Sequence, residues 1–231
     1  MDPINSAVYL VATIRPWNIE AYNKIICRFP GEWHLVTDPG QLTESYLADL
    51  KPRLIFFPHW SSIVPTQITS EFECVCFHET DVPFGRGGSP IQNLIERGHT
   101  ESVVTALKMG PELDSGDVYL KRPFSLHGSA EEIFIRVSHL VASMILEIIT
   151  TRPVPKAQDG PVTLFKRRTP EQSLISGLEP DLNALHDKIR MLDADEYPQA
   201  RIELGQYRFS FSRASLTVKG IHADVLIEKK R

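Results

Sequence analysis

Two titratable side chains, His78 and Asp114, follow apolar segments in positions that suit acid–base chemistry. His78 comes directly after the run ECVCF at 73–77, and Asp114 lies in the glycine-bounded turn GPELDSG at 110–116. An imidazole exchanges protons near neutral pH, and a neighbouring carboxylate fixes its tautomer and favours its charged form. A lone aspartate in a turn is more often a turn former than a catalyst. The candidate is therefore the pair, and neither residue alone.

A glycine-rich loop at 84–90, FGRGGSP, lies between these two residues in the chain. Gly85, Gly87 and Gly88 allow the backbone to approach a ligand closely. Arg86 could bind an anionic group or brace the loop by donating to carbonyl oxygens, and we favour the brace. Trp60 could stack on a ligand or cap the core, and the sequence leaves both interpretations open.

The pattern of elements predicts where these residues lie. Apolar, β-branched runs predict buried strands at 7–14, 33–37, 53–57 and 73–77. Helices are expected between them, at 17–29 and 42–50, which predicts an α/β fold with a Rossmann-like, mostly parallel sheet and helices on both faces. Ligands in such sheets bind beyond the carboxyl ends of the strands. His59 and His78 both fall at such ends.

The second half of the chain predicts further elements and a division into domains. We expect a helix at 90–98, strands at 101–109 and from 117, a long amphipathic helix at 130–151, a helix near 178–192, and a hairpin or small sheet in 200–212 and 220–228. Residues 152–161 contain three prolines and are typical of a linker. The expected domains are therefore a catalytic domain at 1–151, a linker at 152–161 and a small α+β extension at 162–231.

Bulk composition restricts the class of protein. The chain has 231 residues and a formal net charge of -4, so no nucleic-acid partner is expected from its electrostatics. Three cysteines do not make a disulfide framework, and Cys27, Cys74 and Cys76 are expected to be buried, reduced thiols in a cytoplasmic protein. The N-terminus reads as a first strand and not as a signal peptide. We expect no apolar stretch long enough to span a bilayer and no membrane partner.

The segment 78–92, HETDVPFGRGGSPIQ, resembles the signature of the folate-dependent formyltransferase family. That family includes methionyl-tRNA formyltransferase, glycinamide ribonucleotide formyltransferase and the sugar-nucleotide N-formyltransferases. Thr105, Met109 and the run LDSGD at 113–117 follow at the family's spacing. The similarity is good over 54–124 and thin elsewhere, and it is closest to the sugar-nucleotide enzymes.

This resemblance implies the chemistry and a set of roles. The cosubstrate would be N10-formyltetrahydrofolate, and an amine would attack its formyl carbon. His78 would stabilise the resulting oxyanion or relay the proton of the amine, and Asp114 would orient His78. Preorganised donors aimed at such an oxyanion are a large part of catalysis of this kind. The residues expected to bind the folate are Ser62, Ile63, Val64, Arg86, Met109, Gly110 and Leu113, and those expected to bind the acceptor are His59, Trp60, Gly87 and Gly88.

One position departs from the family pattern, because Cys76 stands where the family has an asparagine. The family asparagine donates an amide N–H to the formyl oxygen, and a thiol is a poor donor. Losing such a donor typically costs about a hundredfold in rate. Another donor, His59 or Ser61, could replace it, or the protein could be slow, or it could bind folate without transfer. We favour a replacement donor.

The same residues suggest two other chemistries. Cys76 and His78 share a face of the strand, so a cysteine–histidine nucleophile pair is conceivable, although a buried thiol is the more ordinary interpretation. A metal site from His59, Cys74, His78 and Asp114 lacks the close ligand spacing of typical zinc sites. No metal is expected.

The expected acceptor is a UDP- or dTDP-linked 4-amino-4,6-dideoxy sugar, as in pseudaminic-acid-type glycan biosynthesis. A tRNA acceptor calls for a basic C-terminal module, whereas this chain is acidic and has only about seventy residues after the linker. The closing hairpin could pair two copies in a homodimer. The alternatives are a folate-binding protein without transfer activity, a formyltetrahydrofolate hydrolase, and an enzyme similar to methionyl-tRNA formyltransferase.

Overall fold

The computed structural model describes residues 4–230, which form two compact units. The first unit consists of residues 4–87, 103–124 and 135–164, and the second consists of residues 88–102, 125–134 and 165–230. Each unit is assembled from three separate segments, so no single position in the sequence divides them. The domain boundaries expected at 151/152 and 161/162 therefore stay a prediction.

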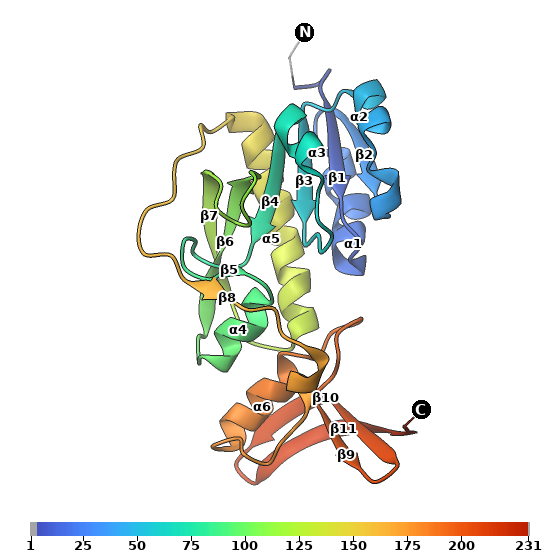
Figure 1. The fold of residues 1–231 in the computed structure, drawn as a ribbon, viewed down its shortest axis with the longest axis vertical. Coiled ribbons are helices and arrows are strands. Elements are labelled where there is room, and N and C mark those ends of the chain that lie inside the picture. Colours follow the sequence, from blue (N-terminus) through green and yellow to red (C-terminus); the bar gives the residue numbers. More distant parts are fainter. Residues whose placement is uncertain (1–3, 231) are drawn as a thin grey trace. The chain divides into compact units, whose positions relative to one another are not determined.

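A six-stranded sheet forms the centre of the first unit (Figure 1). Strands β1 to β4 pair in parallel, and β6 pairs with β4 in the antiparallel sense. The mostly parallel sheet predicted from the sequence is confirmed. The order across the sheet is β2 (Glu32–Val36), β1 (Val8–Ala12), β3 (Leu54–Pro58), β4 (Cys74–His78), β6 (Glu101–Lys108) and β7 (Val118–Ser125).

Helices carry the chain between the parallel strands. Such crossovers are almost always right-handed, so the reversal of direction at the edge strand β2 puts α1 on one face of the sheet and α2 and α3 on the other. Proline precedes or begins α1 and α3, at Pro16 and Pro65, and Thr43 caps α2 through its side chain. The connecting helices are α1 (Pro16–Lys24), η1 (Ile26–Arg28), η2 (Pro39–Gln41), α2 (Glu44–Leu50) and α3 (Thr66–Glu71).

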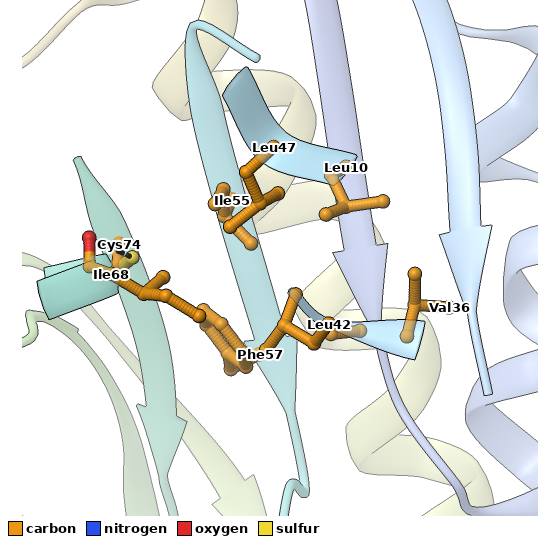
Figure 2. Packing of buried hydrophobic residues seen from close by; sticks show 9 residues of the cluster. Leu10, Val36, Leu42, Leu47, Ile55, Phe57, Ile68 and Cys74 are labelled. Atoms are coloured by element: carbon orange, nitrogen blue, oxygen red, sulfur yellow. Dashed lines mark hydrogen bonds between the residues drawn. The ribbon is translucent and has the colours of Figure 1, made fainter. Parts of the chain in front are cut away.

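One face of the sheet packs against α2 and α3 through aliphatic side chains (Figure 2). Leu47 from α2 and Ile68 from α3 are fully buried against strand residues that alternate along β1 and β3. Cys74 of β4 belongs to the same cluster, so the even-numbered residues of β4 point toward this face. The members drawn in Figure 2 are Leu10, Ala12, Val36, Leu42, Leu47, Ile55, Phe57, Ile68 and Cys74.

The opposite face of the sheet is aromatic. Phe56 is fully buried and lies within 6.5 Å, between ring centroids, of the rings of Tyr9, Trp33 and Phe77. Tyr9 and Trp33 are themselves stacked at 4.8 Å. Aromatic pairs at these separations add to the stabilisation that comes from their buried area.

The long helix α5 (Ala130–Thr151) runs behind the sheet in the view of Figure 1, with the bounds that the sequence predicted. Its buried residues recur every three or four positions, from Ala130 through Val137 and Ile145 to Ile149. The expectation that no apolar stretch is long enough to cross a bilayer is wrong for this helix, which reaches a mean hydropathy of 1.8. More than half of that stretch is buried inside the protein, as in an ordinary core helix.

The expected burial of all three cysteines is also wrong at one position. The helix expected at 17–29 ends at Lys24 and continues as the short turn η1, which puts Cys27 on the solvent side. Its thiol donates to the carbonyl oxygen of Asn23. Cys74 is buried, and Cys76 is partly buried.

The second unit combines short helices with a three-stranded antiparallel sheet in the order β11-β10-β9. The helix expected at 178–192 begins only at Leu182, because the side chain of Asp181 caps it by accepting from the Ala184 N–H at 2.8 Å. Its elements are α4 (Pro90–Glu96), η3 (Pro170–Ser173), α6 (Leu182–Arg190), β9 (Arg201–Leu204), β10 (Tyr207–Thr217) and β11 (Gly220–Lys229). A short pair, β5 (Arg86–Gly87) and β8 (Leu164–Phe165), completes the strands described.

One face of this sheet carries exposed apolar side chains. Tyr207, Ile227 and Val225 are each 46% to 58% exposed, and the register places them on the same face as Phe209. An exposed apolar face of this kind is typical of an interaction surface. The pairing of two copies expected from the sequence stays a prediction.

The aromatic face of the first unit can be tested by removing its central ring. We expect Phe56→Ala to lower the free energy of unfolding by about 3–5 kcal/mol, because it leaves a cavity among three rings. Urea denaturation measures the change. Leu164→Ala removes a side chain that is 72% exposed and should change stability by less than about 0.5 kcal/mol. Equal losses in the two variants would contradict the assignment of the core.

Candidate active site

His78 lies at the carboxyl end of β4 with only 7% of its surface exposed. Its Nε2 is 2.8 Å from the carbonyl oxygen of Gly85. A carbonyl oxygen only accepts hydrogen bonds, so Nε2 carries a proton and donates it. The other ring nitrogen, Nδ1, faces Oδ2 of Asp114 at 3.6 Å. The structure thus brings together the two residues that the sequence paired, and leaves Nδ1 as the nitrogen that can gain or lose a proton.

Asp114 is held in place by the glycine loop and by its own backbone. Its Oδ2 accepts a 2.9 Å hydrogen bond from the N–H of Gly87. Its backbone has φ of +52°, in the left-handed region that aspartate tolerates better than most residues. The same turn makes a close approach at Gly116, where a Cβ atom would lie 1.7 Å from the carbonyl oxygen of Lys108. The turn therefore has little freedom to move the carboxylate away from His78.

Gln158 fastens this turn, and the sequence did not identify it. Its side-chain N–H2 donates at 2.8 Å to the carbonyl oxygens of both Asp114 and Gly116. Its Oε1 accepts from Arg86 Nε at 3.1 Å and from Arg86 Nη2 at 2.8 Å. Arg86 therefore braces the structure, as favoured from the sequence, although its partner is a side-chain amide. Gln158 lay in a proline-containing segment interpreted as a linker, where no periodic pattern marks a single amide.

Cys76 shares a face with His78, as the strand pattern predicts, and packs beside the aliphatic cluster of Figure 2. Burial raises the pKa of the Cys76 thiol, and the nearby Asp114 carboxylate raises it further. The thiol therefore stays protonated near neutral pH and is a poor nucleophile. This favours the buried-thiol interpretation over a cysteine–histidine nucleophile pair.

A second carboxylate, Glu79, lies next to His78 in the chain and is 6% exposed. Burial raises its pKa from 4.5 to about 7, while the His78 ring acts to lower it and Asp114 acts to raise it. Its Oε1 is 3.9 Å from Nδ1 of His59. No sequence signal marked Glu79, because a glutamate at a strand end is ordinarily a solvated surface residue.

His59 and Trp60 extend the site from the carboxyl end of β3. His59 has φ of +49° and packs edge-on against Trp17 at 5.6 Å between ring centroids. Trp60 packs against the aliphatic cluster and makes a 5.9 Å ring contact with Phe57. Its buried Nε1 has no hydrogen-bond partner within the described part of the chain. Trp60 therefore caps the core, and its indole N–H could still meet a ligand.

The residues expected to bind the folate surround these side chains with mixed exposure. Val64 and Met109 pack beside the aliphatic cluster, together with Trp60. Ile63 and Leu113 are 97% and 75% exposed, which is unusual for large apolar side chains beside a candidate site. Ser62 is half-buried and Gly110 is exposed. Their binding role stays a prediction.

The two glycines expected to bind the acceptor make different backbone hydrogen bonds. Gly87 donates its N–H to Asp114. Gly88, in the second unit, donates to the Phe165 carbonyl oxygen at 3.1 Å, and a Cβ atom there would lie 2.5 Å from Cβ of Arg167. A role for these glycines in acceptor binding stays a prediction. Across residues 4–230, no group of three or more His, Cys, Asp or Glu side chains is arranged to hold a metal ion.

Comparison with known proteins shows the family to which the chain belongs. The solved structure of methionyl-tRNA formyltransferase from Clostridium thermocellum is 45% identical, and the match covers 96% of this chain and 99% of that one with a TM-score of 0.94. The chain belongs to the formyltransferase family. A family model for the C-terminal domain of methionyl-tRNA formyltransferase also matches residues 170–228.

Other members of the formyltransferase family differ more. Methionyl-tRNA formyltransferase of Thermotoga maritima is 29% identical over 168 residues, which are 69% of this chain and 53% of that protein. The chain therefore spans about half the length of the curated relatives it matches. The 4-N formyltransferase of Francisella tularensis shares the fold over 98% of this chain and 99% of its own, with a TM-score of 0.66 and 12% identity.

The hydrogen bonds that Gln158 makes to the Asp114 turn and to Arg86 can be tested by an isosteric change. Gln158→Leu removes the partner of two carbonyl oxygens and of the Arg86 guanidinium, and should lower the free energy of unfolding by about 1–3 kcal/mol. Chemical denaturation measures this. Gln67→Leu, at an exposed glutamine of α3, is the matched control. A Gln158→Leu protein as stable as the control would show that these hydrogen bonds contribute nothing to the free energy of unfolding.

The buried Glu79 predicts a pH dependence of stability. Because its folded-state pKa is raised from 4.5 to about 7, the unfolded chain loses this proton first as the pH rises. The wild-type protein should therefore lose stability relative to Glu79→Gln between pH 4.5 and about 7, by up to about 3 kcal/mol, with no further change above that. Thermal or urea unfolding of both proteins across this range provides the measurement. A difference that is constant with pH would mean that Glu79 is not perturbed.

Proposed function

We propose that this protein transfers a formyl group from N10-formyltetrahydrofolate to the amine of a nucleotide-linked 4-amino-4,6-dideoxy sugar. The observation that carries the proposal is the His78–Asp114 contact at the carboxyl edge of the sheet, in a chain of the formyltransferase family. A buried imidazole with one nitrogen fixed by Gly85 and the other facing a carboxylate is suited to proton transfer.

The residues beside this pair fit a flat, partly aromatic ligand such as a reduced folate. Trp60, Val64 and Met109, like Cys76, are partly buried side chains that pack against the same cluster, and the exposed Ile63 and Leu113 side chains would lose water contact when a ring covers them. The Trp60 N–H and the backbone groups of 62–64 and 109–113 supply polar contacts. When bound there, the folate supplies an activated formyl carbon.

The residues of the chain then have separate tasks. His78 Nδ1 takes up the proton that the amine loses, and the Asp114 carboxylate stabilises the positive charge that this puts on the ring. The Gly85 carbonyl oxygen holds the ring in orientation through Nε2. Gln158 and Gly87 hold the carboxylate and its turn in place. Because Cys76 is a poor donor, the negative charge on the formyl oxygen is balanced mainly by the protonated imidazole.

The net charge of the whole chain supports a small acceptor over tRNA. A surface that binds tRNA exposes lysine and arginine side chains to phosphates, whereas this chain has a formal net charge of -4. The C-terminal sheet is an exception, because residues 201–230 hold six Lys and Arg side chains against three Asp and Glu. Arg201, Arg208 and Lys230 share the single carboxylate of Glu203, and this local excess of positive charge favours the second acceptor considered below.

Methionyl-tRNA remains the second candidate acceptor. It is favoured by the 45% identity to a protein named methionyl-tRNA formyltransferase, whose chain this one matches over nearly its full length. Two further candidates are folate binding without transfer, which rests mainly on the replacement of the family asparagine by Cys76, and hydrolysis of the formyl donor.

The proposal is tested by mixing the protein with N10-formyltetrahydrofolate and either a dTDP- or UDP-linked 4-amino-4,6-dideoxy sugar or methionyl-tRNA. We expect tetrahydrofolate release, followed by absorbance, and a formylated sugar in the mass spectrum. His78→Asn and Asp114→Asn should each reduce the rate by about a hundredfold or more, because each removes one half of the proton-transfer pair.

The controls separate the alternatives. Asp49→Asn changes an exposed carboxylate of α2 and should leave the rate unchanged. Formylation of methionyl-tRNA but not of the sugar would show that methionyl-tRNA is the acceptor. Folate release without any amine would indicate hydrolysis, and binding without turnover for every amine would refute the transfer.

A further inference from the structure

The proposed transfer must dispose of two protons. An amine that arrives as an ammonium ion loses both when it becomes an amide: one ends on the folate nitrogen that gives up the formyl group, and the other must leave to a base. One C–N bond forms and one breaks, with no change of oxidation state. A single imidazole can shuttle one proton between the amine and the leaving nitrogen. The remaining proton requires a second acceptor within reach of the amine.

The structure holds a second histidine–carboxylate pair at the same edge of the sheet. His59 follows β3, and its Nδ1 faces Glu79 Oε1 at 3.9 Å. Glu79 follows His78 directly, so each pair has one member at the end of β4, and β3 is the neighbouring strand. The His59 side chain is 19% exposed and that of Glu79 is 8% exposed. The imidazole is therefore the more accessible member of the pair to a ligand.

The position of His59 in the topology also points to a ligand. The crossovers after β1 and β3 leave the sheet in opposite directions, because β1 leads to β2 and β3 leads to β4. This makes the carboxyl ends of β1 and β3 a switch point, the usual location of ligands in such sheets. The ring contact between His59 and Trp17, in the first turn of the helix after β1, shows that His59 lies at this point.

We propose that His59 and Glu79 form a second acid–base pair, which takes from the acceptor ammonium the proton that must be lost before the amine attacks. The inference rests on the formyl transfer proposed above. His59 would accept the proton on Nε2 and pass its charge to Glu79 through Nδ1, so that Glu79 is a positioning and proton-storing residue. The protonated His59 imidazole also supplies a positive charge in the site where Cys76 replaces the amide donor of the family.

The electrostatics of the cluster suit this task. The titratable groups that act on Glu79 are His59, His78, Asp114 and the thiol of Cys76. Burial among them raises the pKa of Glu79 to about 7, and a base matched to the working pH is the most efficient kind. A carboxylate that was only a surface residue would have no such shift.

The backbone of His59 is consistent with a functional position. Its φ of +49° is in the left-handed region, which costs a non-glycine residue stability unless the surroundings impose it. Asp114, in the other pair, has the same conformation, with φ of +52°. Both histidine–carboxylate pairs thus contain one residue held in a sparsely populated conformation, and such residues cluster at active sites.

The experiment compares steady-state kinetics of the full chain, as wild type and as Glu79→Gln, His59→Asn and the double variant. The substrates are N10-formyltetrahydrofolate and a dTDP-linked 4-amino-4,6-dideoxy sugar, over pH 6 to 10. Asparagine tolerates the left-handed backbone that His59 adopts, so His59→Asn removes the titrating ring with little strain. Glu71→Gln, at an exposed carboxylate at the end of α3, is the matched control.

We expect each single variant to lower kcat at pH 7 by about tenfold to a hundredfold, with KM for the folate unchanged. The double variant should be no slower than either single one, because the two residues act as a unit. The loss should shrink as the pH rises above the pKa of the acceptor amine, where the amine arrives already neutral. The control should behave as wild type.

The outcomes separate this inference from the proposed function. An active wild-type protein whose variants keep its rate and pH profile, or lose activity equally at every pH, would overturn the second pair alone. A wild-type protein that formylates no amine would overturn both proposals. A loss confined to low pH and shared non-additively by the two variants would establish the pair.

Discussion

The Asp114 carboxylate is the group on which the candidate site depends, because a single oxygen joins two loops and an imidazole. Oδ2 accepts from the Gly87 N–H and lies 3.6 Å from His78 Nδ1. The glycine loop carries Gly85, whose carbonyl oxygen holds the far side of the same ring. Displacing this carboxylate would therefore remove a hydrogen bond from the loop and the charge that faces Nδ1, while Gly85 and Arg86 still donate to the Thr163 carbonyl oxygen. The interaction that joins the Asp114 turn to the loop is the same one that places a carboxylate beside His78.

The location of this site could be predicted from the sequence because a parallel sheet has a simple geometry. Apolar runs mark the strands, and parallel strands bring their carboxyl ends to one edge. His59 and His78 had to meet there once 53–57 and 73–77 were recognised as neighbouring strands, and the structure pairs β3 with β4. Asp114 was paired with His78 through the family pattern and not through geometry, since a turn between two strands can point its side chains in many directions.

The residues that the sequence did not reveal act through single contacts. Gln158 supports the Asp114 turn from 44 positions away in the chain, with one amide and no repeating pattern. Glu79 follows the end of β4 and is only 6% exposed, and no local propensity indicates that burial. Helix α3 is six residues long and packs chiefly through Ile68, too short for a helical period to be visible. Each of these features depends on tertiary contacts, and neither composition nor local pattern indicates them.

The replacement of the family asparagine by Cys76 leaves the charged groups of the site to determine which acceptor it favours. A neutral amide has given way to a thiol that stays protonated and is therefore also neutral, so the polar side chains around the proposed reaction are two imidazoles and two carboxylates. Glu79 holds its proton up to about pH 7 because burial and the Asp114 charge disfavour a second anion there. A positive ligand relieves that penalty, whereas a negative one increases it. The site should therefore bind the acceptor amine as an ammonium ion, and an ammonium ion cannot attack a carbonyl carbon until a base removes its proton. The electrostatic preference for the cation and the need for a second base are thus two consequences of the same buried carboxylates.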